Sequence, residues 1–217
     1  MRRSPLPIAR GLAAGPRGAS QGWDGLAQED EGEPAHVANR PWEVWYVGEQ
    51  DFDLDHAFAK TVKLLKDPGV LLCGVNDIGK ANLMAIGWAT FGIVWGRPVA
   101  TVFVRPSRYT YEFLESIPDF SINVMHHDLS DAVTWLGTVS GRDCDKLAEC
   151  GLTLAPARQI NTPVVEQAII KYECSVIHRN DVVRAALSRS VAQSYYPRDD
   201  YHRIYYGEIV ECYGPAK

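Results

Sequence analysis

The stretch Gly69–Met125, GVLLCGVNDIGKANLMAIGWATFGIVWGRPVATVFVRPSRYTYEFLESIPDFSINVM, contains the pattern that decides the fold. Apolar and β-branched runs recur in it, and turn residues bound each run, as in Asn76–Lys80 and Trp95–Pro98. A short helix is predicted over about Ser107–Ser116. The runs predict strands over Gly69–Val75, Asn82–Val94, Val99–Val104 and Phe120–Met125. Val70, Leu71 and Leu72 form a continuous apolar run, which indicates a strand buried on both faces.

The connection Arg105–Tyr111 (RPSRYTY) is unusually dense in hydrogen-bond donors. Arg105 and Arg108 supply planar, permanently charged groups that suit a phosphate, and the N–H groups at a helix start add to such an anion site. Pro106 suits a first helical turn, where its missing N–H costs nothing. A strand-to-helix turn whose two arginines are simply solvated would have the same composition, so the residues alone leave both interpretations open.

The run Asn82–Val94 is rich in small residues, including Gly87 and Gly92. Glycine inside a strand commonly marks a bulge, or a place where the backbone closely approaches a ligand. A planar ring against the strand and a tight bend in a closed barrel would both require such glycines. Trp88 is expected either to fill the core or to form a wall of a binding pocket, with core packing preferred.

The segment Asn82–Phe113 resembles the flavoredoxin branch of the flavin reductase family, which consists of FMN-binding split-barrel proteins. Two shorter segments, Ser140–Leu147 (SGRDCDKL) and Tyr201–Ile209 (YHRIYYGEI), resemble further parts of that family, and the resemblance spans about residues 45–213. It implies a bound FMN, rather than FAD, with its phosphate at the Arg105–Thr110 turn and its ring against the Asn82–Thr90 strand. The cofactor-binding residues expected on this basis are Asn82, Met84, Ala85, Gly87, Trp88, Thr90, Arg105, Ser107, Arg108, Tyr109, Thr110, Asn123, Ser140, Gly141 and Lys146.

His202 is the candidate catalytic residue. Related reductases carry a Gly-Asp-His triplet here, whereas this chain has Asp200-Tyr201-His202, so the correspondence is imperfect. The resemblance implies that His202 lies at the exposed face of the flavin and positions a nicotinamide. Alternation along the strand would equally make it an ordinary half-buried residue on the side of Ile204 and Tyr206, and both alternatives remain.

The other segments predict peripheral helices and further strands. Asp55–Lys66 places Phe58, Val62 and Leu65 at helical spacing. Helices are also expected over Leu129–Leu136 and Asp143–Cys150, strands over Pro41–Val47, Val164–Val165, Ala168–Val176 and Tyr201–Tyr213, a hairpin turn at His178–Asp181 and a polar loop over Ser188–Asp200. In the closing strand the expected core residues are Ile204, Tyr206, Ile209 and Val210. The predicted fold class is therefore mainly β: an antiparallel, Greek-key-like, FMN-binding split β-barrel with peripheral α-helices.

Composition and charge indicate how the chain is divided into domains and which kinds of partner are not expected. Residues 1–41 are rich in proline and glycine and lack an apolar period, which predicts a disordered extension, with a targeting segment or an early start codon as alternatives. Residues 42–217 are expected to form one flavin reductase-like domain. The net charge of −5 argues against a general nucleic-acid binder. No membrane span is expected, because no run reaches the roughly 18 apolar residues that one needs.

Cysteine and histidine usage gives no strong motif. His126 and His127 are adjacent, and neighbouring residues on a helix or strand do not face the same way, so no shared metal site is predicted. The five cysteines form no Cys-x-x-Cys pair, which fits reduced thiols in a cytoplasmic protein. Cys144 and Cys150, near the expected pocket, remain candidates for redox activity.

The expected activity is reduction of FMN by NADH or NADPH, with hydride passing from the nicotinamide C4 to the flavin N5. The chain has no Gly-x-Gly-x-x-Gly motif after a strand, so a nicotinamide nucleotide would dock transiently rather than in a domain of its own. The competing hypothesis is a flavoredoxin-type electron carrier without a nicotinamide site, and a third is an FMN-binding structural or sensing module. The resemblance also implies a homodimer, and a protein electron acceptor is one destination for the electrons.

Overall fold

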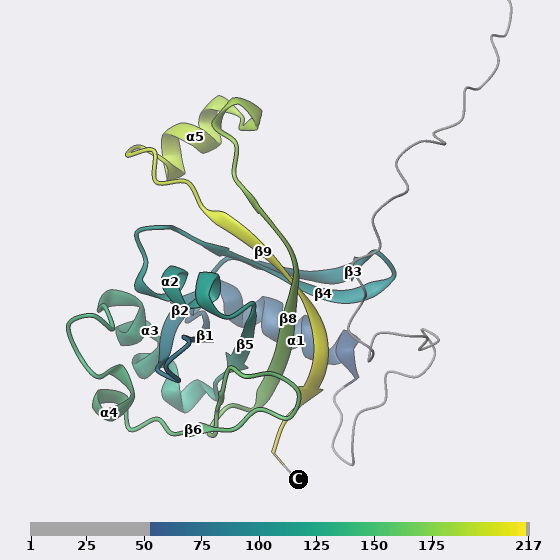
Figure 1. Ribbon diagram of the computed structural model, residues 1–217, viewed down its shortest axis with the longest axis vertical. Coiled ribbons are helices and arrows are strands. Elements are labelled where there is room, and N and C mark those ends of the chain that lie inside the picture. The colour runs from purple at the N-terminus through teal and green to yellow at the C-terminus, as the bar shows by residue number, and fades with distance from the viewer. Residues whose placement is uncertain (1–52, 216–217) are drawn as a thin grey trace, which may run out of the picture. The chain divides into compact units, whose positions relative to one another are not determined.

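The computed structural model describes residues 53–215, and an antiparallel sheet is its main feature (Figure 1). Its strands are β1 (Val70–Val75), β2 (Ala81–Ile86), β3 (Ala89–Val94), β4 (Arg97–Val104), β5 (Asp119–Val124), β8 (Ile170–Asp181) and β9 (Arg203–Tyr213). They lie in the order β2-β1-β5-β8-β9-β4-β3, and every neighbouring pair is antiparallel. β6 (Leu154–Ala155) and β7 (Val164–Val165) form a separate pair. The mainly β antiparallel fold predicted from the sequence is confirmed.

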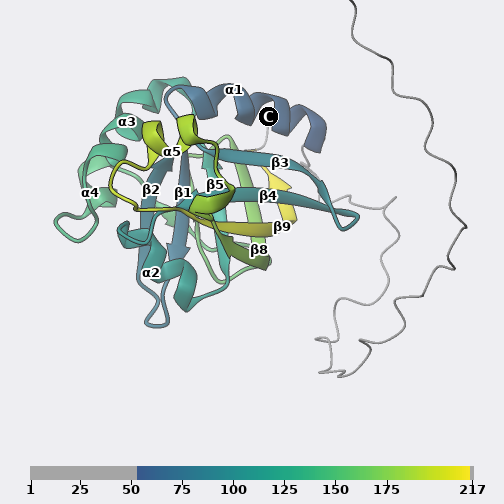
Figure 2. The same cartoon turned by 90° about the horizontal axis from the view of Figure 1, so that it is seen from above.

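Helices surround this sheet. They are α1 (Leu54–Lys66), α2 (Tyr109–Ser116), α3 (Ser130–Thr138), α4 (Lys146–Cys150) and α5 (Arg189–Tyr195), with short 3₁₀ turns η1 (His127–Leu129) and η2 (Arg184–Ala186). Figure 2 shows α1 along one side of the sheet and α3 and α4 beside β2. No helix among the described residues is long and apolar enough to cross a membrane. The predicted extension at 1–41 and the predicted strand Pro41–Val47 lie outside the described residues.

The stretch Asn82–Val94 is two strands, not the single strand that the sequence predicts. β2 and β3 follow each other in the chain, yet they form the two opposite edges of the sheet. The chain therefore crosses from one edge to the other at Gly87-Trp88, which brings the sheet round into a barrel. A Cβ atom at Gly87 would lie 3.1 Å from the carbonyl oxygen of Leu65. The glycine is thus explained by a tight crossing beside the end of α1.

A two-residue hairpin joins β3 to β4. Val94 pairs with Arg97, and the residues between them, Trp95 and Gly96, have φ angles of 53° and 70°. Positive φ at both central positions is the type I′ arrangement, whose twist matches that of the flanking strands. Trp95 is an unusual residue for this conformation, because a bulky side chain in the left-handed region is strained.

The core has two parts on either side of β1, whose residues are all buried, as the sequence predicts. Val70 and Leu72 face the barrel interior with residues of β4, β5, β8 and β9. Leu71 and Cys73 face the opposite way and pack under α3 against Val133 and Leu136. Burying a strand on both faces in this way fixes the position of α3 relative to β1 and β2.

α1 covers the barrel with Ala57, Thr61 and Leu65, which are its buried residues. The prediction that Val62 lies on this face is wrong, because its side chain is 52% exposed. The buried residues of α1 follow the spacing i, i+4, i+8, and this spacing places the polar residue Thr61, rather than Val62, against the barrel. The Thr61 hydroxyl is satisfied within the core, since it donates to Ala57 O at 2.8 Å and lies 2.7 Å from the Tyr172 hydroxyl.

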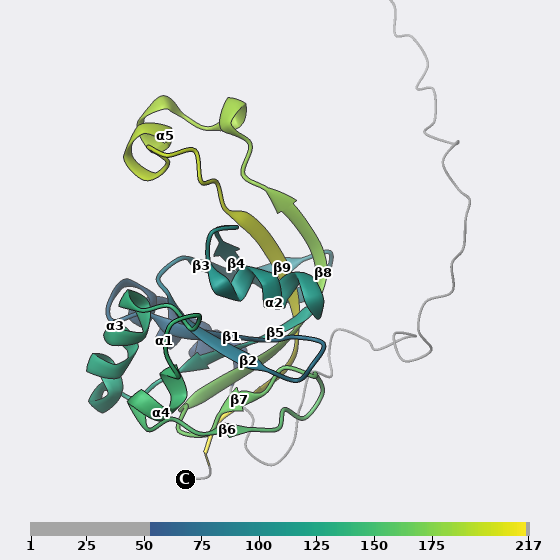
Figure 3. The same ribbon diagram turned by 60° about the vertical axis from the view of Figure 1, so that its left-hand side comes forward.

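β8 and β9 continue beyond the barrel as a two-stranded arm that carries α5 (Figure 3). The turn predicted at His178–Asp181 is wrong, because these residues extend β8 and pair with β9 as far as Asp181–Arg203. Their polarity reflects exposure of the ribbon rather than a turn. Arg203 forms an ion pair with Asp181 at 2.8 Å and another with Glu115 of α2 at 3.0 Å. The predicted polar loop Ser188–Asp200 contains α5.

In the first half of β9, the side chains that are buried are the opposite set from those predicted. Tyr205 and Ile209 are buried, whereas Ile204, Tyr206 and Val210 are only half-buried. Ile209 was therefore predicted correctly, and the other three were not. Register shifts interrupt the β8–β9 pairing, one between Glu173 and Cys174. Burial nevertheless alternates without a break from Tyr205 to Glu211, so the prediction failed because it placed Ile204 and Tyr206, rather than Tyr205, on the core face.

Candidate functional site

A cavity of about 840 Å³ opens between β2, the start of α2 and the end of α3. Ten of the fifteen cofactor-binding residues predicted from the sequence line it: Asn82, Met84, Ala85, Ser107, Arg108, Tyr109, Thr110, Ser140, Gly141 and Lys146. These residues come from three separate segments of the chain. The close contacts of β2 with α2 and α3 bring the segments together.

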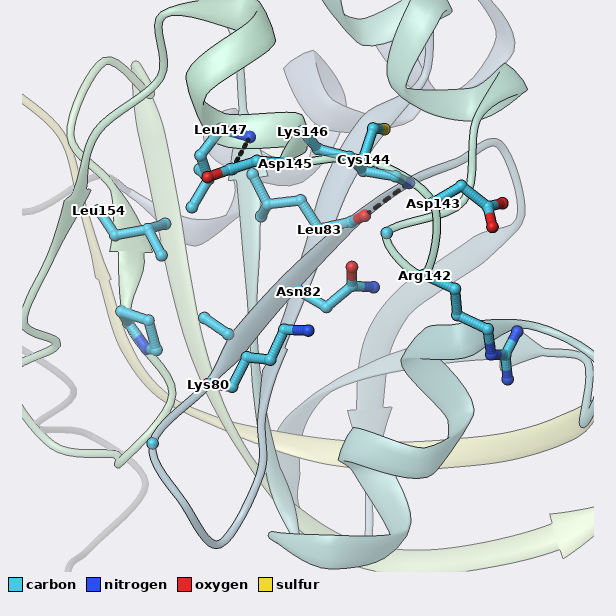
Figure 4. Close-up of a pocket in the computed structure, with 14 residues that line it drawn as sticks. Lys80, Asn82, Leu83, Arg142, Asp143, Cys144, Asp145, Lys146, Leu147 and Leu154 are labelled. Atoms are coloured by element: carbon cyan, nitrogen blue, oxygen red, sulfur yellow. Dashed lines mark hydrogen bonds between the residues drawn. The ribbon is translucent and has the colours of Figure 1, made fainter.

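A second cavity of about 640 Å³ adjoins the first and shares part of its wall, including Asn82, Gly141, Cys144 and Lys146. Figure 4 shows Asn82 and Leu83 of β2 opposite the loop that carries Arg142 and Asp143. The two cavities therefore form neighbouring parts of one site along β2.

Arg108 supplies a positive charge to the larger cavity, which Arg142 and Lys146 also line. It lines the cavity at the residue before α2, and no group within residues 53–215 accepts a hydrogen bond from its guanidinium. No side chain caps the start of α2 either. Unpaired N–H groups at a helix start and a free guanidinium both favour an anion, so their convergence makes an anion-binding corner.

One wall of the larger cavity depends on a close approach at Gly141. Asn82 donates from Nδ2 to Thr110 Oγ1 at 2.8 Å, and both residues are buried. A Cβ atom at Gly141 would overlap the Asn82 side-chain oxygen, and it would also lie 3.4 Å from the Tyr109 ring. Only glycine lets the Ser140–Gly141 loop lie against this hydrogen-bonded pair.

Lys146 is buried behind the same loop. Its ammonium donates to Leu83 O in β2 and to Leu136 O in α3, each at 3.0 Å. Burial lowers the pKa of Lys146 below its usual value. Because the ammonium links two walls of the cavity, its main contribution is to hold them together.

Sequence reasoning missed several residues that line the cavity. They are Trp135, Leu136, Gly137, Thr138, Val139, Arg142, Asp143 and Glu149, whereas Cys144, which was expected near the pocket, also lines it. Arg142 lies with its guanidinium carbon 4.7 Å from the Tyr109 ring centre and forms an ion pair with Glu112. Gly137 gave a usable signal, because a glycine near a helix end permits close contact; a Cβ there would lie 3.4 Å from Ala85 Cβ.

Five predicted cofactor-binding residues do not line the cavity. Arg105 donates to the carbonyl oxygens of Tyr195 and Asp200, both at 2.8 Å, so it anchors the α5 segment. Asn123 is buried in β5, where it donates to Ser121 Oγ and accepts from Val165 N. The others, Gly87, Trp88 and Thr90, lie at or beyond the point where the chain leaves β2 for the opposite edge.

His202 and Trp88 lie together near the α5 segment. Their ring centres are 4.9 Å apart, and His202 Nδ1 lies 2.9 Å from the Tyr196 hydroxyl. His202 is 8% exposed, whereas Trp88 is 40% exposed, so Trp88 is not a core residue. Burial, with Arg105 nearby, lowers the pKa of His202 to about 4. The imidazole is therefore neutral at pH 7, and neither residue lines the cavity.

None of the five cysteines, all of which lie in the described part of the chain, forms a disulfide. Cys144 lines both cavities and its thiol lies 3.6 Å from Ser140 O. Burial raises the pKa of the Cys150 thiol, which opposes formation of a reactive thiolate at that position.

Comparisons with known proteins give the same fold. The chain is 26% identical to a flavoredoxin from Methanosarcina acetivorans, with a TM-score of 0.54 and 68% of each chain covered. A split barrel domain from Shewanella frigidimarina matches with a TM-score of 0.56 at 15% identity, covering 73% of this chain and 74% of that one. An FMN-binding domain of a flavin reductases-like enzyme from Shewanella baltica matches with a TM-score of 0.52 at 22% identity, covering 72% and 74%. The split-barrel fold is thus confirmed.

A curated relative, an uncharacterized protein of Pyrococcus abyssi, is 29% identical over 102 residues. The match covers 47% of this chain and 58% of that protein's length, so the chain spans little more than half of the relative. The family described as flavin reductase like domain matches residues 67–217, which include both cavities and the whole sheet. This chain therefore belongs to the flavin reductase like domain family.

Proposed function

We propose that this chain binds FMN in the larger cavity and acts as a flavin reductase that takes its electrons from NADH or NADPH. The observation that supports this function is the anion-binding corner formed by Arg108 and the uncapped start of α2, in a chain of the flavin reductase like family. The corner supplies the charge that an FMN phosphate requires.

The lining residues fit FMN. The cavity of about 840 Å³ falls within the roughly 300–1,000 Å³ usual for small-molecule sites. Thr110 Oγ1 accepts a hydrogen bond from Asn82, which leaves its own proton for a phosphate oxygen. Ser107 is less suited to this role, because its hydroxyl donates to Asp200 at 2.6 Å. Met84, Ala85 and Trp135 give the cavity an apolar side that suits a flat ring.

When bound, FMN would supply the redox chemistry by accepting a hydride from the nicotinamide. The residues of this chain would bind FMN and orient it. Arg108 and the α2 N–H groups hold the anionic end, and Asn82 with Gly141 closes the wall behind it. Lys146, through Leu83 O and Leu136 O, keeps β2 and α3 at a fixed separation.

The second candidate function is an electron carrier with no productive nicotinamide site, which the similarity to a flavoredoxin favours. The two functions are separated by mixing the purified, FMN-loaded protein with NADH or NADPH under anaerobic conditions. For the reductase we expect rapid bleaching of the flavin absorbance by one of the two nucleotides. A protein that binds FMN but is bleached only by a chemical reductant is the carrier.

We propose that the protein is a homodimer. Trp95 and Ile93, at the tip of the β3–β4 hairpin, are 64% and 70% exposed, and Trp88 and Tyr195 are also exposed. Contiguous exposed apolar side chains favour an interface, and the rings of Trp88 and Tyr195 are in contact, with their centres 5.2 Å apart. Trp95 additionally keeps a strained positive φ, which supports a role for its side chain beyond the turn itself.

Light scattering at micromolar concentration is therefore expected to give a mass of about twice the 24.1 kDa of the chain. Replacing Trp95 by asparagine, which suits the turn conformation, should shift the population toward monomer without loss of secondary structure. A wild-type protein that remains monomeric at these concentrations contradicts the dimer.

His202 retains a proposed role in positioning the nicotinamide, through its contact with the half-exposed Trp88. As a neutral imidazole it would act as a hydrogen-bond partner, not as a charge. Its pKa of about 4 also has a consequence for stability. In the unfolded chain His202 is protonated below its ordinary pKa of about 6.5. In the folded chain it stays neutral until the pH falls to about 4. Acid therefore destabilises the fold over this window.

From this group alone we expect the free energy of unfolding to fall by about 2 kcal/mol between pH 8 and pH 5. The measurement is urea denaturation of wild type and His202→Gln across that range. The variant should lose less stability on acidification than wild type, whatever its stability at pH 8. Parallel pH dependences for the two proteins would show that His202 titrates normally in the folded state.

We further propose that residues 42–217 form the functional domain in a reducing, cytoplasmic setting, and that residues 1–41 are dispensable for it. The absence of disulfides among the five cysteines supports the compartment. The change of composition near residue 41 supports the boundary, and the family match at residues 67–217 lies wholly within the proposed domain.

A further inference from the structure

Two histidines and an aspartate form a compact cluster at the junction between β5 and α3. His126 Nδ1 lies 3.0 Å from one Asp128 oxygen, and His127 Nε2 lies 2.8 Å from the other. The remaining ring nitrogens, His126 Nε2 and His127 Nδ1, lie 3.2 Å apart. One ligand-type atom from each of the three residues lies within 4.8 Å of the other two.

The prediction that adjacent histidines face apart is wrong here, because neither a regular helix nor a strand spans them. His126 is extended, with φ −66° and ψ 152°, while His127 begins the 3₁₀ turn η1. The change of backbone conformation between the two residues brings the imidazoles to a centre-to-centre distance of 4.1 Å. Hydrogen bonds from Leu129 N to His126 O and from Ser130 Oγ to His127 O hold the turn.

With both imidazoles neutral, this cluster has too few protons to make a hydrogen bond at each of its close contacts. Each neutral imidazole has one N–H, so the pair has two protons, whereas the three close contacts require three. If both rings donate to Asp128, two nitrogen lone pairs face each other at 3.2 Å. A cation between these nitrogens, either a third proton or a metal ion, removes the repulsion.

The distance between the facing nitrogens suits a metal ion. Imidazole nitrogens bind Zn²⁺ at about 2.0–2.1 Å, so two of them at a near-tetrahedral angle are separated by about 3.3 Å. Asp128 then accepts from the second nitrogen of each ring. A carboxylate behind a metal-bound histidine is the usual arrangement that fixes the tautomer and orients the ring.

We propose that His126 Nε2 and His127 Nδ1 bind one divalent transition-metal ion of the late first row, with Asp128 as the carboxylate that orients both rings. Imidazole favours Ni²⁺, Cu²⁺ and Zn²⁺ among the common divalent ions. All three residues are exposed, so water completes the coordination sphere. The site lies at the beginning of α3, whose other end lines the larger cavity, and it is separate from the flavin-binding residues.

The test is calorimetric titration of the untagged, full-length protein with NiCl₂ at pH 7.5. We expect one saturable site per chain in the wild type. His126→Asn and His127→Asn should each weaken binding by at least about tenfold, and Asp128→Asn by about 10- to 100-fold. His56→Asn, an exposed histidine on α1, is the matched control and should titrate like wild type.

Metal binding to the folded chain should also raise the thermal midpoint of the wild type and of His56→Asn, but not that of the His126→Asn/His127→Asn double variant. This readout needs neither flavin nor activity, so it is independent of the proposed function. Nickel binding of equal strength in the wild type and the double variant would overturn the proposal, as would a wild type with no saturable binding.

Discussion

Replacing Arg108 by alanine is expected to weaken FMN binding by about 10- to 100-fold while the protein stays folded. A hydrogen bond to a charged group contributes about 1.5–3 kcal/mol, and each 1.4 kcal/mol corresponds to a factor of about ten in affinity. Among the described residues Arg108 donates to no protein acceptor, so its removal leaves no buried group unsatisfied. Fluorescence titration of the apoprotein with FMN gives the dissociation constants.

Arg105→Ala is the matched comparison, because the same residue type lies three positions earlier in the same turn. Its guanidinium is occupied by Tyr195 O and Asp200 O, and it stacks on Tyr196 at 5.2 Å. Its loss should loosen the α5 segment and change FMN affinity by less than about threefold. If Arg105→Ala releases FMN and Arg108→Ala does not, the anion site is formed by the other arginine.

The turn proposed to hold the phosphate was recognisable in the sequence because its hydrogen-bond donors are consecutive residues. Arg108, Tyr109 and Thr110 are consecutive, and a donor-rich strand-to-helix connection is recognisable without knowing what it contacts. Family resemblance then added Ser140, Gly141 and Lys146, which local patterns alone do not connect with the turn. These residues meet Asn82 only because β2 lies between α2 and α3 in the folded chain.

The division between β2 and β3 was not predictable from the pattern. Both strands are rich in small and apolar residues, so the run Asn82–Val94 looks continuous. What separates them is the curvature of the whole sheet, which places consecutive strands at opposite edges. This one difference explains why Gly87, Trp88 and Thr90 do not line the cavity beside Asn82 and Met84, although the sequence puts all five on a single strand.

The sequence also did not reveal that two carboxylates are buried and hydrogen-bonded to residues far away in the chain. Glu173, fully buried in β8, accepts from the backbone N–H groups of Arg158 and Gln159 and from the Tyr213 hydroxyl. Asp119 holds Asn161 and Thr162 in the same way. These two carboxylates order the loop between β6 and β7, and an acidic residue in a strand gives no sign of partners 14 or more positions away.

Gly207→Ala is expected to destabilise the barrel strongly. A Cβ atom at this position in β9 would lie 2.5 Å from Phe120 Cζ and 2.7 Å from Cys174 Cβ. Both neighbours are fully buried, so neither has room to move. Overpacking a core costs about 1–3 kcal/mol, and here two rigid neighbours are involved, so we expect at least about 2 kcal/mol. For a chain of this size, about 2 kcal/mol corresponds to a fall in the thermal midpoint of about 4–8 °C.

Gly92→Ala is the control for this substitution, because Gly92 also lies within a strand but a Cβ atom there would have no neighbouring atom within 4 Å. Added bulk meets no obstacle at this position, and alanine reduces the entropy of the unfolded chain, so the expected change is neutral or slightly stabilising. Combining Gly207→Ala with Phe120→Leu removes the ring that clashes and should restore part of the lost stability. Urea denaturation of the four proteins distinguishes the cases, since a steric cause predicts recovery in the double variant, whereas a general intolerance of alanine in these strands predicts equal losses at Gly207 and Gly92.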